Sequence, residues 1–177
     1  MKKITTMMTV AGLILTLLGA AAAQTIDPID SIRQHYAKIN QNVKLYRRVK
    51  KNLSGFSAEG GELIAYFHGP TVMKMTATFF GETGRSNEEY YFWDGKLIFI
   101  LSTESHYNKP LSGKVARKIE NRFYFKDDKL IRWLDENGKE VASDSAEYAE
   151  KQDDYLKMSK QFVDGAKSKA ATIESPD

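Results

Sequence analysis

The chain has 177 residues, with 26 Lys and Arg against 23 Asp and Glu, and it has no Cys. The near balance of charge argues against a nucleic-acid-binding protein, and the lack of Cys excludes disulfides, thiol catalysis and a lipid-modified cysteine. The length suits one domain with a single hydrophobic core, so we expect packing alone to stabilise it.

The first 23 residues have the pattern of a cleavable signal peptide. Lys2 and Lys3 precede an uncharged apolar stretch, 10–18, and small residues follow at 19–23. An apolar stretch of about nine residues cannot span a bilayer, which needs about 20. The pattern predicts cleavage before Gln24, a periplasmic or secreted bacterial protein, and no membrane span after cleavage. An uncleaved membrane anchor is the alternative.

Amphipathic helices are expected at both ends of a single α+β domain, residues 24–165. The first has Asp27 as its N-cap and Pro28 at the first helical position, and its apolar residues recur every three or four positions as far as Tyr46. The second covers about 144–164, with Gly165 placed to end it. The tail, 166–177, is rich in Lys, Ser, Ala and Thr and is predicted to be disordered.

Between these helices, an alternating apolar pattern predicts an antiparallel meander of about six strands. Turn-forming pairs separate the strands at Gly69-Pro70, Asp94-Gly95, Asp127-Asp128 and Asn137-Gly138. An internal repeat lies in the meander, because residues 91–98, YFWDGKLI, recur 33 positions later as YFKDDKLI with six of eight residues identical. Each copy centres on a two-residue turn. The repeat therefore predicts two similar hairpins with the cross-strand pairs Phe92–Leu97 and Phe125–Leu130.

Several short strings within residues 60–140 suggest a relationship to other proteins. They are GETG at 81–84, EYYF at 89–92, YNKP at 107–110, ENRFYF at 120–125 and LIRW at 130–133. In these strings the chain resembles a group of small exported bacterial proteins of unassigned function. The resemblance implies a location in the bacterial envelope and brings no activity or site residue with it.

Charge is unevenly distributed along the chain. Seven basic residues and no acidic residue lie between Asp30 and Glu59, whereas acidic residues are enriched in 144–164. Solvated helix faces explain this pattern, and complementary packing of the two terminal segments is the alternative.

The sequence lacks the common motifs of metal sites and hydrolases. His35, His68 and His106 do not have metal-ligand spacing, and no Ser lies in a nucleophile elbow. Glu88 and Glu89 are adjacent on a strand and should point to opposite faces, so they cannot act together as an acid and base. The string at 81–84 is expected to be a tight connection between strands. No cofactor and no metal are predicted.

Strand alternation predicts two different sheet faces. The face expected to pack against the helices is nearly all apolar and consists of Tyr90, Phe92, Leu97, Phe99, Phe123, Phe125, Leu130 and Leu134. The other face mixes aromatic and charged residues, and the candidate binding residues on it are Tyr91, Trp93, Arg122, Tyr124 and Trp133. These rings either contact a partner, or they shield an exposed sheet or pack beneath the second helix.

A loop rim at Glu104, His106 and Tyr107 is a second candidate site, because polar residues cluster there on what is expected to be a long connection. The leading interpretation is an exported, non-enzymatic binding module that recognises a protein or an envelope polymer through the aromatic and basic face. The alternative is a hydrolase-like envelope enzyme with Glu104 and His106 as its acid and base. A pocket that contains both side chains would favour the enzyme.

Overall fold

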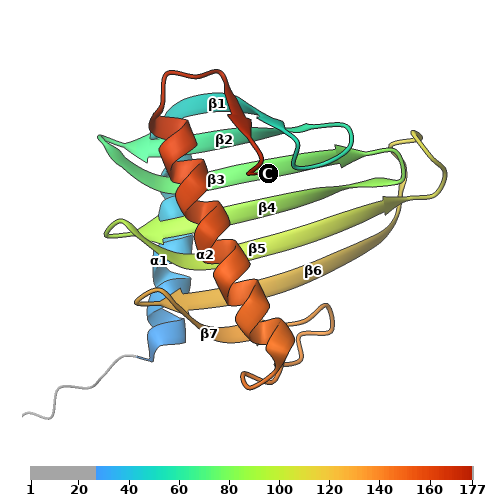
Figure 1. Cartoon of the computed structure of the whole chain (residues 1–177). Coiled ribbons are helices and arrows are strands. Elements are labelled where there is room, and N and C mark those ends of the chain that lie inside the picture. The colour runs from blue at the N-terminus through green and yellow to red at the C-terminus, as the bar shows by residue number, and fades with distance from the viewer. Residues whose placement is uncertain (1–26, 177) are drawn as a thin grey trace, which may run out of the picture.

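In the described residues of the computed structural model, 27–176, one eight-stranded sheet carries a helix on each face (Figure 1). The elements in chain order are α1 (Pro28–Asn42), η1 (Val43–Leu45), β1 (Arg47–Ser54), β2 (Gly61–His68), β3 (Thr71–Gly81), β4 (Gly84–Trp93), β5 (Lys96–Tyr107), β6 (Val115–Lys126), β7 (Lys129–Leu134), α2 (Ala146–Lys167) and β8 (Thr172–Glu174). The strand order is β7-β6-β5-β4-β3-β2-β1-β8, and only β1 and β8 are parallel.

The predicted α+β class, with a largely antiparallel sheet and two helices, is confirmed, although eight strands form instead of about six. The segment 81–84 is the tight connection between β3 and β4. The predicted signal peptide, 1–23, lies outside the described residues. Within the described part of the chain, no helix has the length and apolar character needed to cross a membrane.

Helix α1 begins as the sequence predicts and ends earlier. The Asp27 carboxylate accepts a hydrogen bond from the N–H of Ile29 at 2.9 Å, and Pro28 occupies the first turn. The helix buries Ile32 and Ile39 against Tyr91, Ile98, Phe99 and Tyr124 of β4, β5 and β6. The helix ends at Asn42, before the last residues of the expected apolar stripe, because the chain turns through η1 and enters β1.

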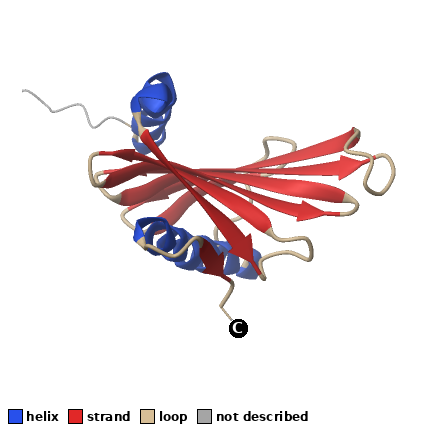
Figure 2. Ribbon diagram, turned by 90° about the horizontal axis from the view of Figure 1, so that it is seen from above, coloured by secondary structure: helices blue, strands red, loops and turns tan. Residues whose placement is uncertain are grey.

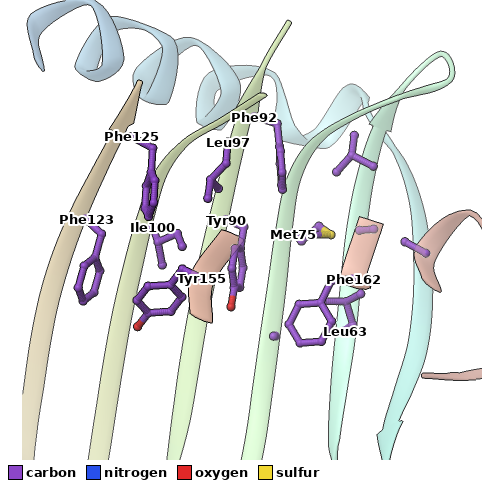
Figure 3. Packing of buried hydrophobic residues seen from close by; sticks show 14 of the residues in the cluster. Leu63, Met75, Tyr90, Phe92, Leu97, Ile100, Phe123, Phe125, Tyr155 and Phe162 are labelled. Carbon is purple, nitrogen blue, oxygen red and sulfur yellow. The ribbon is translucent and has the colours of Figure 1, made fainter. Parts of the chain in front are cut away.

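Helix α2 covers the opposite face and completes the larger core. Its Tyr148, Tyr155 and Phe162 are one heptad apart and buried, as the predicted stripe requires. Phe162 packs among aliphatic and aromatic side chains of β2, β3 and β4, and Tyr155 packs nearer to β5 and β6 (Figure 3). The two helices therefore bury separate clusters on the two faces of one sheet.

The C-terminal segment is ordered, so the prediction of a disordered tail is wrong for 166–176. Helix α2 continues past Gly165 to Lys167, and the chain returns as β8 beside β1. Ile173 of β8 is buried directly on Gly165, where the Cβ of any larger residue would overlap the Ile173 side chain. Gly165 thus allows the close approach of β8 instead of ending the helix.

The repeated hairpins have the predicted pairs and share one unpredicted feature. Phe92 pairs with Leu97, and Phe125 pairs with Leu130. In each copy the next pair skips one residue of the second strand, so Ile98 and Ile131 are bulges at equivalent positions. Because a bulge reverses the alternation, Phe99 and Leu134 face α1, contrary to expectation, and Trp133 faces α2.

The two helices lie on opposite faces of the sheet (Figure 2), and the ends of β3 to β6 project beyond both helices (Figure 1). Among residues 27–176, no ion pair joins the basic stretch 33–51 to the acidic stretch 144–164. The basic stretch of β1 instead meets the C-terminal end of α2, where the Lys51 ammonium donates hydrogen bonds to the carbonyl oxygens of Ser168, at 2.9 Å, and Ala170. The projecting strand ends leave sheet surface that no helix covers.

Candidate functional site

A groove runs along the α1 face, from the side of α1 onto the projecting strands. It consists of two hollows that share Leu101. The first, of about 390 Å³, lies beside α1 and is lined by Arg33, Tyr36, Glu120 and Arg122, among others. The second, of about 400 Å³, lies on β3 to β6 and is lined by Thr78, Arg85, Asn87, Glu89, Thr103 and Lys118, among others. We call these two hollows the α1-face groove.

A buried polar network forms part of the floor of this groove. The Lys74 ammonium lies 3.1 Å from the Glu89 carboxylate and donates hydrogen bonds to the Tyr91 hydroxyl, at 2.9 Å, and to Asn40 Oδ1, at 3.2 Å. The Tyr91 hydroxyl donates to Glu89 at 2.5 Å. Burial, reinforced by this hydrogen bond, raises the pKa of Tyr91 far above its usual range, so the hydroxyl remains a donor. The network holds one Glu89 oxygen in place beneath the groove.

Basic side chains outnumber acidic ones along the groove. Its four basic residues are Arg33, Arg85, Lys118 and Arg122, and its two acidic residues are Glu89 and Glu120. Glu120 is paired with both Lys118, at 3.3 Å, and Arg122, and Lys74 neutralises Glu89. Arg85 is exposed and has no ion-pair partner among residues 27–176. The groove therefore presents cationic donors next to hydroxyl and amide groups.

The structure brings only some of the predicted binding residues to this groove. Arg122 and Tyr124 line it. Tyr91, Tyr124 and Trp133 are 0%, 5% and 6% exposed, so the expectation that these rings are displayed to a partner is wrong. Helix α1 covers Tyr91 and Tyr124, and the bulge at Ile131 turns Trp133 beneath α2.

Trp93 lies at a separate hollow near the start of α1. This hollow, of about 430 Å³, is lined by Ser31, His35, Trp93, Lys96 and Asp127, among others. The His35 ring stacks on Trp93, with ring centroids 3.9 Å apart and an interplanar angle of 19°. Burial lowers the pKa of His35, which favours the neutral form of the ring. Trp93 is partly buried by this contact and packs α1 against β4.

Glu104, His106 and Tyr107 lie on β5 and not on a loop, because β5 continues to Tyr107. Glu104 and His106 point to the α2 face of the projecting strands, where one Glu104 oxygen lies 3.7 Å from His106 Nε2. Both side chains line a hollow of about 220 Å³. Each is 51% exposed, so the solvent screens both groups.

Glu88 lies on the same face, between Glu104 and α2. Burial raises the pKa of its carboxyl, and a hydrogen bond from the Tyr90 hydroxyl opposes the shift in part. Glu88 and Glu89 point to opposite faces, as predicted, and each accepts a hydrogen bond from the tyrosine two residues later.

No family model, curated protein or solved structure matches the chain. The site must therefore be interpreted from its own geometry. The α1-face groove is open and lined with cations, hydroxyls and amides, which suits an extended ligand that carries negative charges. Within residues 27–176, no three His, Asp or Glu side chains gather as a possible metal site.

Sequence reasoning missed Lys74, Asn40, Arg85 and Lys118. One signal for Lys74 was available, since it is a single charged residue in the otherwise apolar run 72–75. A charge at a buried strand position requires a partner. That partner, Glu89, comes from the neighbouring strand, and neither periodicity nor spacing identifies it.

Proposed function

We propose that the protein is a non-enzymatic binding module of the bacterial envelope, with its ligand in the α1-face groove. The observation that carries the proposal is the position of the groove. It runs from the side of α1 onto the projecting strand ends, and three of its four basic side chains, Arg85, Lys118 and Arg122, lie on strands of the sheet. Binding residues that a sheet holds in place lose little conformational entropy when a ligand arrives.

The groove chemistry supports an anionic ligand. Arg85 and Arg122 are guanidinium groups, which form paired hydrogen bonds with carboxylates and phosphates. Side chains on one face of a strand recur about every 7 Å, and neighbouring strands are about 4.8 Å apart. An extended acidic protein segment or an anionic envelope polymer would therefore meet donors at regular intervals.

The test is a titration of the full chain with two polyanions, poly-glutamate and an anionic polysaccharide, and with dextran as the neutral control. We expect binding to at least one polyanion and none to dextran. Arg85→Gln with Arg122→Gln should weaken binding at least about tenfold, because each lost charge-assisted hydrogen bond contributes about 1.5–3 kcal/mol.

The matched control is Lys126→Gln with Lys129→Gln, which removes the same charge from exposed residues beside the β6–β7 turn. It should bind as the unmodified chain does. Equal losses in both double variants, or binding to neither polyanion, would contradict the groove as the site.

A second candidate function is a hydrolase-like enzyme at Glu104 and His106. One observation favours it, namely that both side chains line one hollow and lie 3.7 Å apart. Their exposure argues against it, since acid and base groups act most effectively when water is excluded. Turnover of chromogenic esters or glycosides by the full chain that disappears in His106→Asn and Glu104→Gln would favour the enzyme. No turnover, or turnover that both variants retain, would contradict a hydrolase site at Glu104 and His106.

A further inference from the structure

One corner of the molecule combines an exposed apolar side chain with unpaired positive charge. Leu45, in η1 between α1 and β1, is 81% exposed, more than any other large hydrophobic side chain in the described residues. Lys44, Arg47 and Arg48 surround it in sequence and are exposed. None of these three cations has an ion-pair partner among residues 27–176. An exposed leucine at this position does not contribute to the core.

The two arginines that follow Leu45 in the chain are held on opposite faces of the sheet by aromatic rings. Arg47 and Arg48 are consecutive on β1 and therefore point to opposite faces of the sheet. The Arg47 guanidinium lies over the Phe67 ring, 4.5 Å from its centroid, and that of Arg48 lies 5.7 Å from the centroid of Tyr66. Stacking on aromatic rings orients the guanidinium groups and leaves their N–H donors free.

The C-terminal end of α2 adds charge of the same sign to this edge of the sheet. The Lys51 contact with Ser168 fixes the end of α2 beside β1, and Lys167 and Lys169 are exposed there. We call Lys44, Leu45, Arg47, Arg48, Lys167 and Lys169 the basic corner.

The segment that follows β7, at the opposite edge of the sheet, is acidic. Helix α2 begins beside β7 and ends beside β1 (Figure 1), so its two ends lie at opposite edges of the sheet. Residues 135–154, which include its first turns, contain eight acidic and two basic residues. The basic corner and the acidic segment 135–154 therefore lie at opposite edges of the sheet. Near a negatively charged surface, this separation of charge turns the basic corner toward that surface.

We propose that the basic corner docks on a bilayer surface that carries anionic headgroups, with Leu45 entering the headgroup region. A protein partner would need a pocket shaped for Leu45, whereas a lipid interface accepts one protruding apolar side chain without a preformed pocket. Cations beside such a side chain attract anionic lipids, and the attraction is additive over several residues. The corner lies apart from the α1-face groove, so docking does not depend on a ligand in the groove.

The first test places one fluorescent probe on the full chain, which has no Cys of its own. An environment-sensitive dye on Leu45→Cys should shift to shorter wavelength with vesicles of phosphatidylglycerol and phosphatidylcholine, and not with phosphatidylcholine alone. The control is Leu111→Cys, because Leu111 is 71% exposed on the β5–β6 loop between Lys109 and Lys114. A shift at position 111 that equals the shift at 45, or no shift at 45, would overturn the proposal.

The second test measures the partition of unlabelled variants onto the same anionic vesicles. Lys44→Gln with Arg47→Gln and Arg48→Gln should weaken partition on the order of 100-fold, since each cation near an anionic surface contributes about fivefold. Leu45→Ser should weaken it roughly tenfold. Arg47→Lys with Arg48→Lys keeps both charges but loses the stacking of the guanidinium groups on β2. This variant should partition as the unmodified chain does, which would show that charge and not stacking causes the binding.

The matched control is Lys126→Gln with Lys129→Gln and Lys139→Gln, which removes three exposed charges away from the basic corner. Its partition should equal that of the unmodified chain. An equal loss in this control, or partition that does not fall as salt is raised, would overturn the proposal. Thermal unfolding of each variant verifies that the fold is retained.

Discussion

At the scale of single residues, the four consecutive side chains 88–91 place one carboxylate on each face of the sheet, and each carboxylate accepts a hydrogen bond from a tyrosine. Tyr90 donates a hydrogen bond to Glu88 on the α2 face, and Tyr91 donates to Glu89 on the α1 face. Lys74 compensates Glu89 at 3.1 Å, whereas Glu88 has no cation at ion-pair distance among the described residues. Burial therefore raises the pKa of Glu88.

This difference predicts how stability changes with pH. Because the folded-state pKa of Glu88 is above its unfolded value, the folded chain binds more protons in the interval between the two values. The free energy of unfolding should fall as pH rises through that interval. Glu88→Gln should remove this fall and be more stable than the unmodified chain at pH 7. Urea unfolding from pH 3 to 8 measures it, with exposed Glu59→Gln as the control. Parallel pH profiles for all three proteins would show that Glu88 does not cause the fall in stability.

The two tryptophans should differ in their contribution to stability. Trp133 is buried, and its Nε1–H donates to Asn121 Oδ1 at 3.1 Å. Trp133→Ala should lower the free energy of unfolding by about 3–5 kcal/mol. Trp93→Ala loses mainly a stacked contact with His35 and should cost about 1 kcal/mol. Chemical denaturation measures both. Similar small losses would mean that both rings face solvent, as strict strand alternation predicts.

At the scale of elements, the repeated hairpins show two separate effects. The turn sets the first cross-strand pair, and the bulge sets which face of the sheet the later residues occupy. Two-residue turns set the pairs Phe92–Leu97 and Phe125–Leu130, and both copies have positive φ at the turn residues, including Asp127 and Asp128. One residue beyond each pair, a bulge reverses which face the strand presents. The repeat therefore conserves a whole hairpin, bulge included, and the face of every later residue depends on that bulge.

The last element, β8, should contribute to stability although it has three residues. Ile173 is buried between α2 and the sheet, so Ile173→Ala should lower the free energy of unfolding by about 2–4 kcal/mol. Glu174→Ala, with an exposed side chain on the same strand, is the control and should change it by less than about 0.5 kcal/mol. Hydrogen exchange gives a second measurement, because the amides of Asn52 and Ser175 bond across β1 and the C-terminal segment. Fast exchange at both amides would show that the segment is not docked.

At the scale of the whole molecule, the position of the helices decides which surface is available. Helix α1 covers the aromatic residues of β4 to β6, and α2 covers the other face, whereas the ends of β3 to β6 extend beyond both helices (Figure 1). The aromatic residues that sequence reasoning assigned to recognition consequently serve packing. The polar residues farther along the same strands form the groove.

The predicted export signal can be tested by the mass of the exported protein. Cleavage before Gln24 should give an exported protein whose intact mass lacks residues 1–23, because small residues precede that position as signal peptidase requires. Mass spectrometry of the protein recovered from the periplasm or medium measures this directly. Recovery of the uncleaved chain from the membrane fraction would support the alternative of an uncleaved anchor.

Features that depend on neighbours a few residues apart could be predicted from the sequence alone. The cap at Asp27, the hairpin turns, the heptad of α2 and the pairs next to the repeated turns are all of this kind. The sites were less predictable. Glu104 and His106 were assigned to a loop although both lie on β5, and Lys74, Arg85 and the groove were not found.

Only the tertiary structure decided which face each residue occupies and which faces are covered. A bulge of one residue at Ile98 or Ile131 reverses the alternation, and apolar periodicity does not reveal it. The partners of Lys74 and of Ile173 come from segments distant in the chain. The sequence by itself therefore determined both helices, most of the central strands and the pairing next to the repeated turns. The side on which each helix packs, and hence the location of the groove and of the basic corner, depended on contacts between distant segments that no local pattern encodes.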